Sequence, residues 1–136
     1  MVQLDKPPKT RYGDQMSHYE VFSTAKPNPQ DSEVADIDPN ELWSKRDKVS
    51  IVDVRRPDEF NGELGHIPGA KMIVLDTLPD RIDEIPRDQS LIFVCRSGNR
   101  SARAVQWAIS EGFTNVYNMS GGMLLWNKLK LETSKS

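Results

Sequence analysis

One cysteine is the residue best placed for covalent chemistry. Cys95 is the only cysteine among the 136 residues, and it directly follows the apolar run Leu91–Val94. A polar loop comes next, and a segment with helical spacing begins at Ser101. If the run is a strand and the segment a helix, the thiol faces backbone N–H groups and the positive end of a helix dipole. That position favours a thiolate, or an anion carried by its sulfur.

The loop after Cys95 is rich in positive charge and in hydrogen-bond donors. Its arginines favour the thiolate, which is the nucleophilic form of cysteine. Gly98 can adopt a positive φ, which lets successive N–H groups point inward as an anion-binding nest. Because this turn joins a predicted strand to a helix, we favour a functional site over a buried cysteine with solvated arginines, the common role of a lone cysteine. The residues predicted to bind substrate are Arg96, Ser97, Gly98, Asn99, Arg100 and Ser101.

The length of this loop separates two kinds of anion site. A cysteine phosphatase of this design places its phosphate-binding arginine in the pattern C-x5-R. Here that position is occupied by Ser101, and Arg100 gives C-x4-R instead. A shorter loop makes a tighter cradle, which fits one extra sulfur atom better than a tetrahedral phosphate. A phosphatase or arsenate reductase is therefore the less favoured enzyme class.

The segments around the loop alternate between strand and helix patterns. Such alternation predicts a mostly parallel sheet with helices on both faces, and sites in such sheets form beyond the carboxyl ends of the strands. Asp38 is predicted to cap the first helix, with Glu41 completing a capping box. The predicted strands are 34–37, 50–55, 70–74, 91–94 and 115–119, and the predicted helical segments are 38–46, 57–60, 78–85, 101–111 and 123–130. The apolar stripe expected on the 101–111 helix is Ala102, Val105, Ala108 and Ile109.

The composition is that of an ordinary globular protein. A net charge of −2 gives no reason to expect binding to nucleic acid or to a membrane surface. No apolar run approaches the ~18 residues of a membrane span, and the N-terminus lacks the apolar core of a secretory signal. One cysteine cannot form an internal disulfide, which fits a reducing compartment. We therefore expect a cytoplasmic protein.

The chain divides into three parts by composition. Residues 1–32 are polar and are predicted to be a partly ordered N-terminal extension, in which 26–30 is a linker. Residues 33–131 carry the alternating pattern and are predicted to be one domain. Residues 132–136 are predicted to be a C-terminal tail.

Several other polar and aromatic residues are assigned structural roles. Asp53 and Arg55 are predicted to form a structural ion pair, and Glu59 is assigned a similar structural role. His66 lies in a Gly-His-Ile-Pro-Gly turn and is predicted to be a hydrogen-bonded structural residue. Two histidines and one cysteine, widely spaced, predict no metal site. Trp126 is the tryptophan expected to border the pocket.

The sequence CRSGNRSA at 95–102 resembles the active-site loop of rhodanese-domain sulfurtransferases. Over about 34–129, further similarity to that family lies in VDVR at 52–55 with Glu59 and Phe60, in GHIPGA at 65–70, and in Asn115-Val116-Tyr117, Gly121-Gly122 and Trp126. This resemblance implies a rhodanese-like three-layer α/β fold, with a central, mainly parallel five-stranded sheet and helices on both faces.

The resemblance also implies a mechanism. Cys95 would take sulfane sulfur from a donor as a persulfide and pass it to an acceptor, in a ping-pong cycle. The N–H groups of 96–101 would stabilise the persulfide anion, and Arg96 and Arg100 would bind an anionic donor such as thiosulfate. Cyanide or a thiol, a protein thiol included, would be the acceptor, and no metal or organic cofactor is implied. The alternative is a sulfur-carrier or binding module for one protein partner, which the N-terminal arm would contact.

Overall fold

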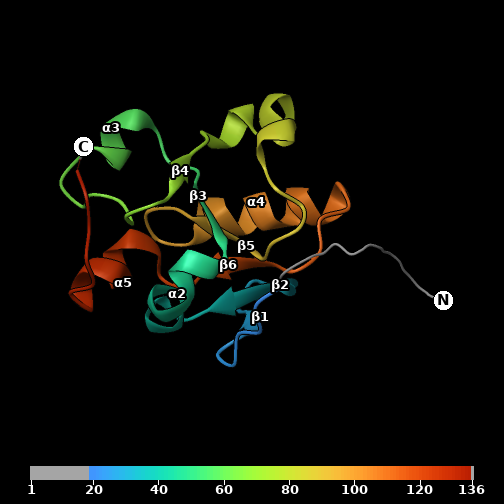
Figure 1. Cartoon of the computed structure of the whole chain (residues 1–136), viewed down its shortest axis with the longest axis horizontal. Helices are drawn as coiled ribbons and strands as arrows, with labels where there is room; N and C mark the ends of the chain where they lie inside the picture. Colours follow the sequence, from blue (N-terminus) through green and yellow to red (C-terminus); the bar gives the residue numbers. More distant parts are fainter. Residues whose placement is uncertain (1–18, 136) are drawn as a thin grey trace.

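Six strands form one mixed sheet in the computed structural model, which describes residues 19–135 (Figure 1). The order across the sheet is β1-β2-β6-β5-β3-β4, and every neighbouring pair is parallel except β1 and β2. The predicted α/β class and mostly parallel sheet are confirmed, whereas the predicted count of five strands is wrong. The strands are β1 (Lys26–Asn28), β2 (Asp31–Ile37), β3 (Ser50–Asp53), β4 (Lys71–Met72), β5 (Leu91–Val94) and β6 (Val116–Met119).

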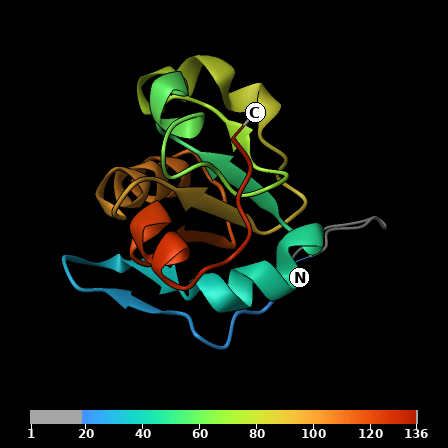
Figure 2. The same ribbon diagram turned by 90° about the vertical axis from the view of Figure 1, so that its left-hand side faces the viewer.

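The sixth strand comes from the segment that was predicted to be a linker. β1 and β2 form an antiparallel hairpin at one edge of the sheet, which Figure 2 shows in blue. Pro27 is compatible with this position because an edge strand can lack one N–H donor. The linker interpretation of 26–30 is therefore wrong, and the predicted domain boundary between residues 32 and 33 falls inside β2. His18, which is expected from the sequence to be a surface residue of the extension, lies outside the described residues.

The helices follow the predicted order with shifted ends. The helix after Cys95 begins two residues earlier than predicted, because Gly98 adopts a φ of 107° at the N-cap. The segment near 78–85 is a 3-10 helix. No helix within residues 19–135 combines the length and apolar character needed to cross a membrane. The α-helices are α2 (Pro39–Lys45), α3 (Pro57–Phe60), α4 (Asn99–Ser110) and α5 (Gly122–Lys128), and the 3-10 helices are η1 (Arg46–Lys48), η2 (Leu75–Thr77) and η3 (Pro79–Glu84).

The start of α2 confirms one capping prediction and corrects another. The Asp38 carboxylate accepts a hydrogen bond of 2.7 Å from the N–H of Asn40, as expected of an N-cap. Glu41 does not complete a capping box. Its carboxylate accepts the N–H groups of Ser23 and Thr24 at 2.8 and 2.9 Å, and so ties residues 19–25 to the domain.

Alternation along the strands divides the core into two halves. In β5, Leu91 and Phe93 pack with α4, whereas Ile92 and Val94 pack with α2 and α5 on the other face. The sheet is therefore covered on both faces. The stripe of α4 differs from the predicted one, because Ile109 is 42% exposed. Its buried residues have the i, i+3, i+4, i+7 spacing of one helical face and are Ser101, Ala104, Val105 and Ala108.

The carboxyl ends of four parallel strands, β2, β6, β5 and β3, lie side by side at one end of the sheet. Asp36 of β2 pairs in register with Asn118 of β6, and Asn118 also pairs with Phe93 of β5. Cys95 follows β5, and Asp53 ends β3. Polar residues thus end several neighbouring strands at the edge where sites form in parallel sheets.

Candidate active site at Cys95

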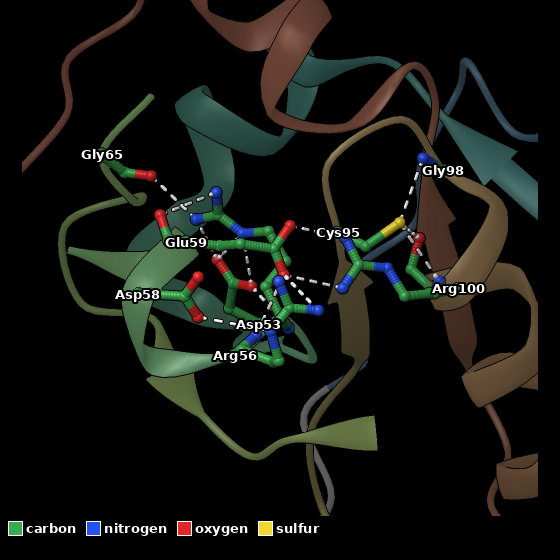
Figure 3. Close-up of polar contacts among 10 residues, drawn as sticks. Asp53, Arg56, Asp58, Glu59, Gly65, Cys95, Gly98 and Arg100 are labelled. Atoms are coloured by element: carbon green, nitrogen blue, oxygen red, sulfur yellow. Dashed lines mark hydrogen bonds and ion pairs between the residues drawn. The ribbon is translucent and has the colours of Figure 1, made fainter. Parts of the chain in front are cut away.

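The loop Cys95–Arg100, here the Cys95 loop, wraps the cysteine sulfur with hydrogen-bond donors (Figure 3). The N–H of Gly98 donates to Sγ at 3.1 Å, and the N–H of Ser101 donates at 3.3 Å. The Ser101 hydroxyl lies 3.2 Å from the same atom. Cys95 is only 1% exposed, yet its sulfur faces these polar groups. The structure therefore brings Cys95, Gly98 and Ser101 together, and Sγ can carry negative charge where it lies.

The first turn of α5 forms backbone hydrogen bonds with the start of the Cys95 loop. The N–H groups of Met123 and Leu124 donate to the carbonyl oxygens of Cys95 and Arg96, at 2.9 and 3.0 Å. Gly122 has a φ of +59°, and a Cβ there would lie 2.4 Å from the Arg96 carbonyl oxygen. Only glycine allows this approach of two backbones.

Gly122→Ala is expected to destabilise the protein by about 3 kcal/mol or more and to displace the Cys95 loop, because conformational strain and a clash add. Gly69 is a matched control, since its φ is also positive, at +90°, but a Cβ there would meet nothing within 4 Å. Gly69→Ala should therefore lose only the ~1–2 kcal/mol of a left-handed alanine. Urea unfolding of both variants measures the difference. Equal losses would show that the close approach at Gly122 has no energetic role.

A chain of buried hydrogen bonds runs from the cysteine to the hairpin. The Ser101 hydroxyl also contacts Oδ1 of Asn118, and Nδ2 of Asn118 donates to the Asp36 carboxylate at 2.9 Å. Asn28 of β1 donates to the same carboxylate at 3.1 Å. Because a hydroxyl has one proton, Ser101 can donate to Asn118 or to Sγ, but not to both at once. Asp36 and Asn118 were not predicted as site residues, although their positions at strand ends beside Cys95 could have indicated them.

A buried ion pair fixes the segment that faces the Cys95 loop. Arg55 and Asp53 are 1% and 0% exposed, and their closest charged atoms are 2.8 Å apart. The Arg55 guanidinium also donates to the carbonyl oxygens of Gly65 and Glu59, at 2.8 and 3.2 Å. The predicted structural ion pair is confirmed, and it holds the backbone of residues 59–65 in place.

A second ion pair engages the last residue of the Cys95 loop. Both Nη atoms of Arg100 donate to the Glu59 carboxylate at 2.8 Å, in a bidentate contact (Figure 3). This hydrogen bonding to Arg100, opposed by partial burial, lowers the pKa of Glu59 from 4.5 to about 2. Glu59 thus lies in the site, next to a residue predicted to bind substrate. The sequence prediction gave it only a structural role.

The Glu59–Arg100 pair should give the protein an acid-sensitive contribution to stability. Because the folded-state pKa of Glu59 lies below the unfolded value, the contribution is complete above pH 4.5 and is lost as the pH falls towards 2. We expect Glu59→Gln to lower the free energy of unfolding by about 1–2 kcal/mol at pH 7, allowing for the partial exposure of both groups. Denaturant titrations of both proteins from pH 7 to pH 2 test this. If the difference in free energy of unfolding between the two proteins were as large at pH 2 as at pH 7, the low pKa of Glu59 would be contradicted.

The other predicted loop residues lie at the surface. Arg96, Ser97 and Asn99 are exposed. Within residues 19–135, no salt bridge joins the Arg96 guanidinium to a carboxylate. Arg96 borders a depression of about 180 Å³ that lies beside the Cys95 loop. The residues that line it are Arg55, Asp58, Glu59, Gly62, Glu63, Leu64 and Arg96.

His66 and Trp126 have structural positions. Nδ1 of His66 lies 2.8 Å from the carbonyl oxygen of Phe60, and the two rings stack at 3.6 Å between centroids, as the structural prediction requires. Trp126 is fully buried beside Trp43, so the expectation that it borders the pocket is wrong. Within residues 19–135, no three His, Cys, Asp or Glu side chains form a group that could hold a metal ion.

The part of the chain that contains Cys95 is similar to known proteins. Residues 38–129 match the family model of the rhodanese-like domain. The thiosulfate sulfurtransferase GlpE of Pseudomonas aeruginosa is 34% identical over 94 residues, which cover 68% of this chain and 84% of that protein. The YqhL protein of Bacillus subtilis is 42% identical over 79 residues, or 58% of this chain, and the match spans only 61% of its length. The crystal structure of a rhodanese-like domain protein from Staphylococcus aureus is 35% identical with a TM-score of 0.63, covering 73% of this chain and 97% of that one.

Proposed function

The chain belongs to the rhodanese-like domain family, and from that premise we propose that it transfers sulfane sulfur through a persulfide on Cys95. One observation carries the proposal. Sγ of Cys95 lies within hydrogen-bonding distance of two backbone N–H groups and one hydroxyl, although the residue is almost completely buried. The two N–H donors are fixed by the backbone before any reaction, so they stabilise an anionic sulfur without reorganisation.

The proposed cycle has two balanced steps. The Cys95 thiolate attacks the outer sulfur of an anionic donor such as thiosulfate. The sulfur–sulfur bond of the donor then breaks, and sulfite leaves with the electron pair. Cyanide or a thiol next attacks the outer sulfur of the persulfide, which gives thiocyanate or a new persulfide and restores the thiolate. A protein thiol is included among these acceptors, and the cycle uses no metal or organic cofactor.

The N–H groups of the Cys95 loop and of Ser101 have two roles in this proposal. Those of Gly98 and Ser101 contact Sγ itself. The N–H groups of Arg96, Ser97, Asn99 and Arg100 form no hydrogen bond to Sγ among the described residues. We propose that they serve the outer sulfur of the persulfide, which extends one bond further from the strand end.

Thiocyanate formation from thiosulfate and cyanide tests the function. We expect turnover with these substrates and no hydrolysis of an aryl phosphate, because the C-x4-R loop is too short for phosphate. Aryl phosphate hydrolysis without thiocyanate formation would favour a phosphatase. Loading of one sulfur atom without turnover would favour the carrier module that serves one protein partner.

A further inference from the structure

The positive charges around the Cys95 loop are largely neutralised within the protein. Three guanidinium groups, one in the loop and two just after β3, contact carboxylates. They form the pairs Arg55–Asp53, Arg56–Asp58 and Arg100–Glu59, and Arg56 also lies 3.9 Å from Glu59. Arg96 lines the depression, and no carboxylate contacts it within residues 19–135. An anionic donor in the depression therefore meets Arg96 as the one lining guanidinium group, among the described residues, that no carboxylate contacts.

Glu59 limits the hydrogen bonds and the positive charge that Arg100 has available for a sulfur donor. It occupies both Nη atoms of Arg100, and its low pKa keeps it ionised through the neutral range. A donor that approached these atoms would have to displace the carboxylate or accept its repulsion. Glu63 adds a further carboxylate to the same depression. Repulsion of this kind grows with the charge of the donor, because each added unit of charge interacts with the same carboxylates.

We infer that Glu59 is a specificity-determining residue, which makes the site select hydropersulfide donors (R–S–S–H and its anion) over dianionic thiosulfate. The inference rests on the proposed persulfide cycle and names its preferred class of donor. A hydropersulfide carries sulfane sulfur with at most one negative charge on the reacting group. In the step, Sγ bonds to the outer sulfur of R–S–S–H and the donor sulfur–sulfur bond breaks. The leaving thiolate takes the proton, so that a thiol and the Cys95 persulfide anion result.

The test measures sulfur loading of Cys95 in single turnovers, followed by intact-protein mass spectrometry. Its two probes are thiosulfate and the hydropersulfide of N-acetylcysteine amide, whose only ionisable group is the persulfide. Glu59→Gln removes the charge but keeps the size of the side chain. We expect this variant to load from thiosulfate about tenfold faster, the effect of one nearby charge in a partly solvated site, and from the hydropersulfide within about twofold of the wild-type rate.

Glu84, at the end of η3, provides a matched control because it neither lines the depression nor contacts the Cys95 loop in any hydrogen bond or salt bridge of the described residues. It forms a bidentate pair with Arg81, with both contacts at 2.8 Å, and this pair together with a contact from Lys71 lowers the pKa of Glu84 to about 2 as well. Glu84→Gln thus removes the same charge and the same kind of ion pair without releasing Arg100. We expect it to leave both loading rates unchanged.

Several results would overturn the inference. Thiosulfate loading could stay constant or fall in Glu59→Gln, both donors could accelerate equally, or Glu84→Gln could match Glu59→Gln. If Glu59→Gln loses its native circular dichroism spectrum, the inference is tested on the wild-type protein alone. Its hydropersulfide-to-thiosulfate rate ratio must exceed the ratio for free N-acetylcysteine amide thiolate, and a smaller ratio contradicts the inference. Loading by neither donor would reject the proposed function itself, whereas equal preference rejects only the role of Glu59.

Discussion

Cys95→Ser should abolish sulfur transfer, lowering turnover by about a thousandfold or more. A serine hydroxyl remains protonated near neutral pH, and it cannot form the sulfur–sulfur bond of the intermediate. The serine oxygen can still accept hydrogen bonds from the N–H groups of Gly98 and Ser101, which contact Sγ in the wild-type protein. The fold should therefore be retained. Thiocyanate formation measures the activity, and circular dichroism with thermal unfolding serves as the control.

A substantial residual rate in Cys95→Ser would contradict the role of Cys95 as the sulfur carrier. If Cys95→Ser kept activity within tenfold of the wild-type rate, Cys95 could not be the atom that carries sulfur. If it lost activity together with its native spectrum, Cys95→Ala would decide the matter. That smaller side chain fits the space of the thiol and should also be inactive, with the spectrum of the folded protein.

The largest effect on stability is expected for Arg55→Ala. Its guanidinium is 1% exposed, and its removal leaves the fully buried Asp53 without its ionic partner. The carbonyl oxygen of Gly65 loses a donor as well. An uncompensated buried charge costs about 3–5 kcal/mol, so the midpoint of urea unfolding should fall markedly.

Arg56→Ala is the matched control for this prediction. Arg56 is the next residue, but its side chain is 63% exposed. It pairs with Asp58, which is 71% exposed, and lies 3.9 Å from Glu59. Such a pair contributes at most about 1 kcal/mol. Adding Asp53→Asn to Arg55→Ala should restore part of the loss, because it removes the unpaired charge. Equal effects of the two arginine variants would mean that the buried pair does not hold the segment facing the Cys95 loop.

Much of the Cys95 loop could be predicted because its determinants are local. A strand, a polar turn and a helix follow one another within 91–111, and each has its own sequence pattern. Gly98 and Ser101 lie three and six residues from Cys95, so the geometry of one loop is enough to bring them to the sulfur. The fold class follows similarly from alternating strand and helix patterns.

The parts that were missed depend on contacts between distant residues. Glu59 and Arg100 are separated by 41 positions, and a pattern of polar and apolar residues carries no information about which charges will meet. Asp36 and Asn118 are separated by 82 positions and become neighbours only when β2 and β6 pair. The hairpin was missed because prolines and polar residues dominate 26–30, whereas an edge strand tolerates both.

Mass spectrometry of the protein after exposure to a sulfur donor tests the central claim most directly. Thiosulfate and a hydropersulfide would be used in parallel, and the peptide that contains Cys95 would then be sequenced by fragmentation. We expect a gain of one sulfur atom on Cys95, which cyanide removes and which Cys95→Ser never shows. Protein that remained unmodified with both donors, or that carried the added sulfur on any other residue, would contradict it.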